Sequence, residues 1–154
     1  MPLYRDIRAL APTDADVCDE IIAGLPEWFG NEKGIRDCAA AVRAQAGLVS
    51  VEDSRVQGFV TWEPRGLDGA EITWMAVRAD ARRRQIGRSL LDALISKLRA
   101  EGVARLEVKT LSQRDPYPPY AETRAFYLAN GFTPVAELDV WGPENPAVLL
   151  SRRL

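Results

Sequence analysis

The chain has 154 residues, of which 47% are hydrophobic, and a formal net charge of -2. This length fits one domain with a sizeable core, and the small net charge gives no general attraction to nucleic acid or to a membrane surface. Because the sequence contains no histidine, it lacks the usual general base and the usual metal ligand, so we expect no metal and no catalytic triad built on histidine.

The first half of the chain predicts one strand, two helices and a β-hairpin. Gly24 and Gly47 follow the two amphipathic patterns and end the helices. Asp53 and Ser54 separate two apolar runs and form the hairpin turn. The elements are expected at residues 3–10 (strand), 13–23 and 32–46 (helices), and 48–52 and 56–63 (hairpin strands).

The second half alternates strands and helices without an internal repeat. A helix with apolar residues from Leu90 to Leu98 at helical spacing ends before Gly102, and a shorter helix ends at Asn130 and Gly131. We therefore expect a single mixed α/β domain over residues 1–154. The remaining elements are expected at residues 71–77, 103–110, 132–140 and 147–152 (strands) and 121–129 (helix).

Cys18 and Cys38 are the only cysteines. Two are too few for a disulfide framework, and both lie in predicted helices, so we expect buried, reduced thiols. The sequence has no apolar run long enough to span a bilayer, and its start at Met1 and Pro2 shows no signal-peptide pattern. We therefore expect a cytoplasmic protein without membrane contact.

Four arginines and a glycine lie between the predicted strand 71–77 and the following helix. They are Arg82, Arg83, Arg84, Gly87 and Arg88. A helix N-terminus presents unpaired backbone N–H groups and a positive dipole end, so cations there are mildly unfavourable on a solvated face. A bound phosphate or pyrophosphate would compensate them. Binding of nucleic acid is disfavoured, because no basic stripe extends beyond this loop.

Two motifs, taken with the order of the elements, resemble one family over almost the whole chain. Residues 82–87 (RRRQIG) are similar to the Q/R-x-x-G-x-G/A pyrophosphate loop of the GNAT superfamily of N-acetyltransferases. Residues 126–132 (FYLANGF) are similar to its F-Y-x-x-x-G-F segment. The resemblance implies an α/β (α+β) fold with a mixed central sheet of about seven strands flanked by about four helices. It also implies acetyl-CoA as the acetyl donor.

The resemblance implies two sets of contacts to acetyl-CoA. The strand backbone at Met75, Ala76 and Val77 would pair with the pantetheine arm like an added strand, and one of its N–H groups would polarise the acetyl carbonyl. Tyr120 stands where many relatives carry an asparagine that contacts this arm. The loop and first helical turn would hold the pyrophosphate through Arg82, Arg83, Arg84, Gln85, Ile86, Gly87, Arg88 and Ser89.

Gln85 departs from the motif, because it occupies the first glycine position in the gap-free register. Glycine permits a positive φ or a close approach to phosphate, so Gln85 either tolerates that geometry or lowers cofactor affinity. A second register over residues 84–89 would place Gly87 and Ser89 at the glycine positions, but it breaks the spacing from the strand.

Attack of an amine on a thioester needs a neutral amine and a proton for the departing thiolate. Tyr127 matches the family position of the general acid, and an ordinary tyrosine pKa of about 10 keeps it protonated. Glu71 is our first choice for the general base, on a face shared with Thr73, Met75 and Val77 if the strand alternates regularly. The alternatives are a packing role for Tyr127 and, for Glu71, a structural role with water relaying the proton to other carboxylates.

The sequence does not determine the identity of the acceptor amine. Loops and strand ends that surround the acceptor in this family carry five aromatic candidates for substrate binding: Trp28, Phe29, Trp62, Tyr117 and Trp141. Such side chains can flank a cationic amine, although each also fits simple packing. We expect acetyl transfer to a small-molecule or peptide amine by direct attack in a ternary complex, in a monomer or homodimer. The alternative is a non-catalytic acyl-CoA-binding or sensing module.

Overall fold

The computed structural model describes residues 5–82, 85–115 and 117–154, so the part of the predicted first strand before residue 5 lies outside it. Within these ranges the chain forms one seven-stranded mixed sheet in the order β1-β2-β3-β4-β5-β7-β6. The strands are β1 (Arg5–Ala9), β2 (Ala46–Glu52), β3 (Arg55–Arg65), β4 (Gly69–Val77), β5 (Arg105–Leu111), β6 (Thr133–Leu138) and β7 (Ala147–Arg153). The helices are α1 (Ala15–Ala23), α2 (Glu32–Ala44), α3 (Ile86–Ala100) and α4 (Pro118–Ala129). None of these described helices has both the length and the apolar character needed to cross a bilayer.

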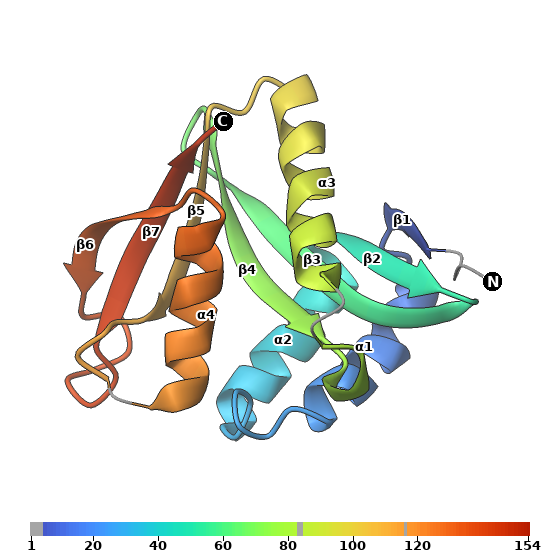
Figure 1. Cartoon of the computed structure of the whole chain (residues 1–154), viewed down its shortest axis with the longest axis horizontal. Coiled ribbons are helices and arrows are strands. Elements are labelled where there is room, and N and C mark those ends of the chain that lie inside the picture. Colours follow the sequence, from blue (N-terminus) through green and yellow to red (C-terminus); the bar gives the residue numbers. More distant parts are fainter. Residues whose placement is uncertain (1–4, 83–84, 116) are drawn as a thin grey trace.

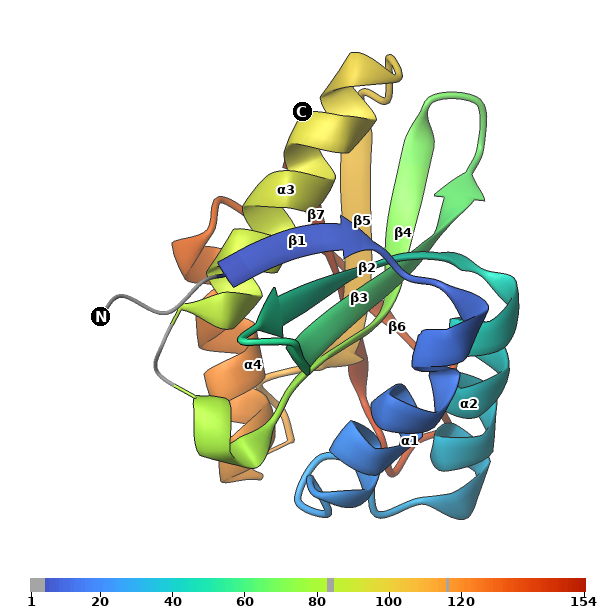
Figure 2. The same ribbon diagram turned by 90° about the vertical axis from the view of Figure 1, so that its right-hand side faces the viewer.

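Helices α1 and α2 cover one face of the sheet, and α3 and α4 cover the other (Figures 1 and 2). Each face has its own apolar core. Leu90 and Leu94 of α3 are fully buried in one core, and Phe59 of β3 is fully buried in the other. Cys18 and Cys38 belong to the core under α1 and α2, where burial raises the pKa of each thiol to about 12. The prediction of buried thiols is confirmed.

Local sequence signals set several element ends. Helix α2 begins after Asn31, whose Oδ1 accepts a hydrogen bond from the backbone N–H of Lys33 at 2.8 Å. Asp53 and Ser54 have φ angles of 50° and 68°, the positive values that a tight two-residue hairpin requires. Helix α4 starts at Pro118, earlier than predicted, because proline is readily accommodated in the first helical turn.

Strands β4 and β5 run side by side for only part of their length. They pair in parallel over residues 69–72 and 105–108, and Figure 1 shows them apart beyond that point. Strand β4 stays paired with β3 as far as Val77, and β5 stays paired with β7 as far as Leu111. In the described chain, the two edges that face each other beyond residues 72 and 108 therefore have no strand partner.

A β-bulge interrupts β4 at the point where the two strands diverge. In its register with β3, Thr61 lies opposite Trp74 and Trp62 lies opposite Ile72. Thr73 is therefore an extra residue on β4, and the alternation of side chains shifts by one position there.

This bulge overturns one prediction about which β4 side chains share a face. Ile72, Met75 and Val77 all contact the core under α3, whereas Trp74 contacts the core under α1 and α2. Because neighbouring side chains on a strand point to opposite faces, Glu71 points away from Ile72. The prediction that Glu71 shares a face with Met75 and Val77 is therefore wrong.

Candidate active site

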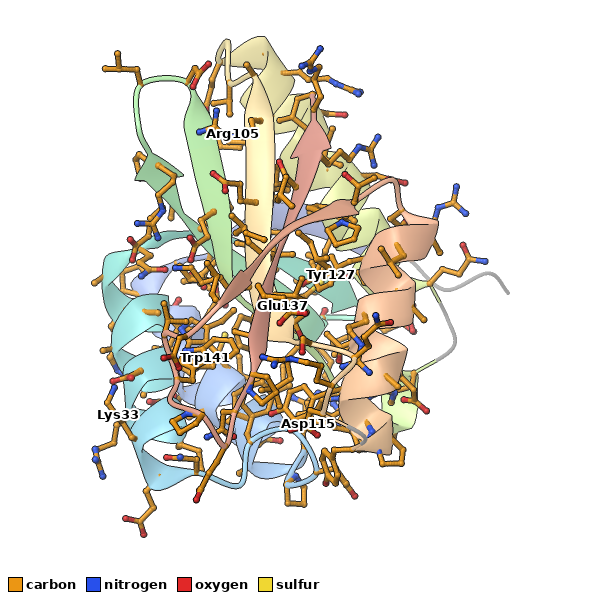
Figure 3. All side chains as sticks on the ribbon, turned by 90° about the vertical axis from the view of Figure 1, so that its left-hand side faces the viewer. Lys33, Arg105, Asp115, Tyr127, Glu137 and Trp141 are labelled. Carbon is orange, nitrogen blue, oxygen red and sulfur yellow. The ribbon has the colours of Figure 1, made fainter. Side chains whose placement is uncertain are left out.

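A groove of about 1280 Å³ lies between the diverging ends of β4 and β5. Side chains from α2, from the start of α3, from α4 and from the segment between β6 and β7 also line it. Figure 3 shows Trp141 toward the α2 side and Tyr127 toward the α4 side. The free edge of β4 over residues 73–77 offers extended backbone N–H and C=O groups, with which an extended ligand arm can pair.

Most of the predicted site residues line this groove. They are Trp28, Phe29, Glu71, Met75, Ala76, Val77, Arg82, Gln85, Ile86, Gly87, Arg88, Tyr120, Tyr127 and Trp141. Ser89 and Tyr117 are outside the lining, and Arg83 and Arg84 lie outside the described residues.

Trp62 was predicted to contact the substrate, and the structure contradicts this. Strand β3 continues to Arg65, so Trp62 lies within the strand and not at its end. Its side chain is only 7% exposed and packs in the core with Leu90 of α3. Trp62 is therefore a core residue and is absent from the described lining of the groove.

Tyr127 is a buried tyrosine whose hydroxyl has no hydrogen-bond partner among the described residues. Its ring makes edge contacts with Phe126 and Phe132, at centroid distances of 5.1 and 5.2 Å. The residue nevertheless lines the groove. Burial raises the pKa of Tyr127 well above its usual value, so the phenol stays protonated at neutral pH. A protonated, unpaired hydroxyl in this position can donate to an anion formed in the groove.

The N-terminus of α3 faces the same groove. Gln85 precedes the helix in the left-handed region, with a φ of 60°, so it adopts the geometry that glycine would have favoured. The first helical hydrogen bond runs from the N–H of Ser89 to the carbonyl of Gln85 at 3.0 Å, which leaves the N–H groups of residues 86–88 available to an anion. Arg82 and Arg88 also line the groove.

Trp28, in the loop between α1 and α2, contacts both Arg82 and the first turn of α4. The indole N–H of Trp28 donates to the carbonyl of Pro119 at 3.0 Å, and the hydroxyl of Tyr120 donates to the carbonyl of Trp28 at 2.8 Å. The guanidinium of Arg82 lies 4.4 Å from the centre of the Trp28 ring, which is a cation–π contact. Trp28 and Tyr120 therefore hold the walls of the groove together, besides lining it.

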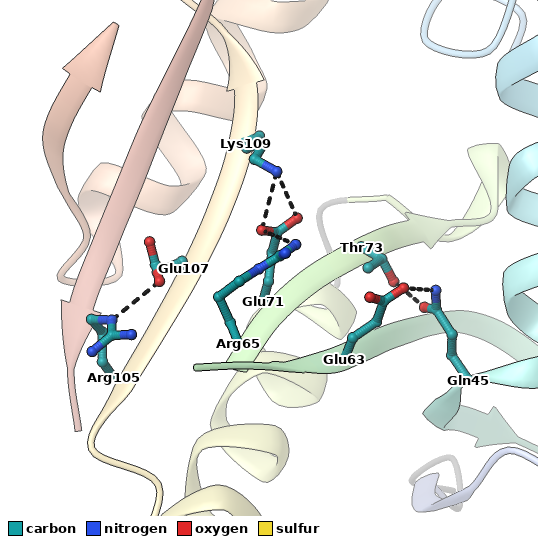
Figure 4. Close-up of polar contacts among 8 residues, drawn as sticks. All are labelled: Gln45, Glu63, Arg65, Glu71, Thr73, Arg105, Glu107 and Lys109. Atoms are coloured by element: carbon teal, nitrogen blue, oxygen red, sulfur yellow. Dashed lines mark hydrogen bonds and ion pairs between the residues drawn. The ribbon is translucent and has the colours of Figure 1, made fainter. Parts of the chain in front are cut away.

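Glu71 lies in the groove with both carboxylate oxygens engaged by cations (Figure 4). Its Oε1 is 2.7 Å from the guanidinium of Arg65 and 3.3 Å from Nζ of Lys109. Its Oε2 accepts from the same Nζ at 3.4 Å. Glu71 is only 8% exposed, so the two cations compensate a nearly buried charge.

A second polar cluster lies beside this one and was not predicted from the sequence (Figure 4). The side-chain amide of Gln45 donates to Oε1 of Glu63 and accepts from the hydroxyl of Thr73. The hydroxyl of Thr73 is also 2.8 Å from that of Thr61. Gln45, Glu63 and Thr73 line the groove, as do Trp74 and Lys109, which were likewise not predicted.

Residues 44–134 match the model of a family described as the acetyltransferase (GNAT) domain. The chain belongs to the GNAT acetyltransferases. The family and the fold class expected from the motifs are therefore confirmed, and the enzyme class is confirmed at the level of the family.

Individual relatives agree with this GNAT assignment. A mycothiol acetyltransferase from Beutenbergia cavernae is 32% identical over 166 aligned positions, which cover 84% of the chain and 54% of that protein. The chain thus spans about half the length of this curated relative. A putative GNAT acetyltransferase from Desulfovibrio desulfuricans superposes with a TM-score of 0.85 at 19% identity, covering 97% of the chain and 99% of that protein. A putative acetyltransferase from Salmonella typhimurium, solved with its cofactor acetyl-CoA, superposes with a TM-score of 0.73 at 20% identity, over 98% and 94% of the two chains.

Proposed function

We propose that this GNAT domain transfers an acetyl group from acetyl-CoA to a primary amine, by direct attack of the amine within a ternary complex. The observation that carries the proposal is the groove between β4 and β5. It combines a free strand edge, a helix N-terminus with arginines, and the hydroxyl of Tyr127, which has no hydrogen-bond partner in the described part of the chain. These are the three features that an extended thioester with a pyrophosphate needs.

The groove residues fit the donor along its length. The free edge of β4 at Met75, Ala76 and Val77 suits the pantetheine arm, whose amide groups pair like those of an added strand. The N–H groups at the start of α3, with Arg82 and Arg88, suit the pyrophosphate. Bound in this way, acetyl-CoA supplies the activated acetyl group at the point where β4 and β5 separate.

Glu71 and Tyr127 then carry out the proton transfers. Glu71 takes one proton from the acceptor ammonium through a water molecule, and the freed lone pair forms a bond to the acetyl carbon. The carbon–sulfur bond breaks, and the hydroxyl of Tyr127 gives its proton to the departing thiolate. The nitrogen of the adduct loses its second proton to solvent, Glu71 releases its proton to solvent, and Tyr127 takes one proton back from solvent. The products are the amide, free CoA and one proton released to solvent.

The first test of this function is thermal stabilisation by acetyl-CoA. A ligand at one hundred times its dissociation constant stabilises the native state by about 2.7 kcal/mol, which is roughly 5–10 °C in melting temperature for a domain of this size. We expect such a shift at millimolar acetyl-CoA, together with CoA release when a panel of amines is added. An unchanged melting temperature would contradict the assignment, and stabilisation without CoA release from any amine would favour an acyl-CoA-binding module.

The left-handed backbone of Gln85 yields a second prediction. Gln85→Gly should bind acetyl-CoA at least as tightly as the parent, because glycine adopts a positive φ without a Cβ clash. Its free energy of unfolding should be unchanged or higher by up to about 1 kcal/mol. Urea unfolding and titration with acetyl-CoA measure the two quantities. A tenfold loss of affinity would show that the Gln85 side chain itself contacts the donor.

A further inference from the structure

We propose that Glu63 binds the ammonium group of the acceptor, and that the acceptor is an ammonium on an apolar body. This inference rests on the proposed acetyl transfer and adds to it the residue that selects the acceptor. Glu63 lies near the end of β3, is partly buried and lines the groove.

Among the described carboxylates that line the groove, Glu63 is the one without a cation in direct contact. Glu63 and Glu71 are direct partners in the antiparallel register of β3 and β4, where like charges destabilise a sheet. Arg65 and Lys109 both bind Glu71. No described lysine or arginine forms an ion pair with Glu63, whose described partner is the neutral amide of Gln45. A ligand cation in the groove would form an ion pair with Glu63 and would reduce its repulsion with Glu71.

A directed chain of hydrogen bonds ends on Glu63. Thr73 uses its hydroxyl proton to donate to the carbonyl oxygen of Gln45, so in the 2.8 Å contact between Thr61 and Thr73 the donor must be Thr61. The other end of the Gln45 amide donates to Oε1 of Glu63. All three donors therefore point toward the carboxylate, and such chains polarise one another and stabilise the negative charge at their end.

This chain fixes one oxygen of Glu63 and leaves the other for a ligand. Gln45 directly follows α2, where its backbone N–H donates to Ala41 at 2.8 Å, so the helix end holds the amide in place. Thr73 is available to Gln45 because the bulge in β4 inserts it there as an extra residue. Oε2 of Glu63 has no hydrogen-bond partner among the described residues, and it can accept from an ammonium in the groove.

Apolar side chains that line the same groove suit the body of the acceptor. Trp74 follows Thr73 on β4 and contacts Phe29, with ring centroids 6.0 Å apart. Val140 and Trp141, between β6 and β7, line the same groove and are 54% and 45% exposed. Exposed apolar side chains that rim a groove mark a contact surface for an apolar ligand. An arylalkyl or alkyl ammonium would place its charge at Glu63 and its apolar body against Trp74, Val140 and Trp141.

The experiment compares an ammonium with a neutral molecule of the same shape. 2-Phenylethylamine and 2-phenylethanol are titrated separately into the CoA-saturated protein at pH 7, and the indole resonances of the tryptophans report binding. We expect the parent to bind the ammonium at least tenfold more tightly than the alcohol, because the ammonium forms an ion pair with Glu63, whereas the alcohol hydroxyl is only a neutral donor. Glu63→Gln keeps an oxygen for Gln45 to donate to. It should bind the two molecules equally, with the affinity for the alcohol unchanged.

Two further variants separate Glu63 from the general charge of the groove. Asp37→Asn removes another groove carboxylate, one that Lys33 already pairs at 2.7 Å, and it should keep the preference for the ammonium. Gln45→Met removes the amide that orients Glu63 and should reduce the preference without changing the affinity for the alcohol. The proposal is overturned if Glu63→Gln keeps the parent's preference, if the parent shows no preference, or if neither molecule binds.

This binding test is independent of turnover, so the two proposals can fail separately. If the preference depends on Glu63 but no amine releases CoA, the proposed acetyl transfer fails and Glu63 still binds the ammonium. If amines release CoA at equal rates in the parent and in Glu63→Gln, acetyl transfer stands and the role of Glu63 is overturned.

Discussion

Replacing Tyr127 with phenylalanine should lower turnover by roughly ten- to ten-thousand-fold, the range that positioned proton transfer contributes. The change keeps the ring and its edge contacts with Phe126 and Phe132, and it removes a hydroxyl that has no partner among the described residues. Affinity for acetyl-CoA and the melting temperature at neutral pH should therefore stay close to those of the parent. Steady-state turnover, acetyl-CoA titration and thermal unfolding measure the three quantities.

The pH dependence of stability gives this variant an internal check. Burial raises the pKa of Tyr127 in the folded protein, whereas the unfolded value is about 10. The neutral phenol therefore contributes stability that is fully present below pH 10 and is lost as the pH rises above it. Tyr127→Phe should lose less stability than the parent in that alkaline range. Full turnover by Tyr127→Phe, where chemistry limits the rate, would make Tyr127 a packing residue.

The second large effect is expected at Glu71. Glu71→Gln should lower kcat/KM by about a hundredfold or more at neutral pH, because the group that accepts the amine proton is gone. The deficit should shrink as the pH approaches the pKa of the acceptor amine, since a larger fraction of the amine is then already neutral. A pH profile of kcat/KM for both proteins measures this.

Glu107→Gln is the matched control for Glu71→Gln. Glu107 is the direct partner of Glu71 in the β4–β5 register, and it also binds an arginine, with Oε1 3.1 Å from the Nε of Arg105. It is outside the described lining of the groove, so its loss should leave the pH profile unchanged. If Glu71→Gln keeps the parent's rate and profile, another group takes the proton or the amine arrives neutral.

The parts of the site that depend on short-range sequence signals could be predicted. Tyr127 was found because its motif is continuous in the chain, and the first turn of α3 was found because arginines and a glycine follow an apolar strand. The positive φ of Gln85 was one of two outcomes that the motif left open. The mixed sheet with helices around it was expected from the order of the elements and from the resemblance to GNAT proteins.

The parts that depend on pairing between distant segments could not be predicted. The extra residue at Thr73 is defined only by the register between β3 and β4, so regular alternation placed Glu71 on the wrong face. Gln45, Glu63 and Lys109 come from the end of α2, from β3 and from β5, and only the folded sheet brings them to one groove. Trp62 was misplaced because β3 extends further than its turn signals indicated.

The most direct test of the account is the initial rate of CoA release while acetyl-CoA and an active amine are both varied. Direct attack in a ternary complex predicts amine-dependent release with double-reciprocal lines that intersect, and a rate at least tenfold lower for Tyr127→Phe. Parallel lines, which indicate an acetylated enzyme, would contradict the proposed mechanism. The absence of amine-dependent release across a broad panel of amines and peptides would contradict the proposed function itself.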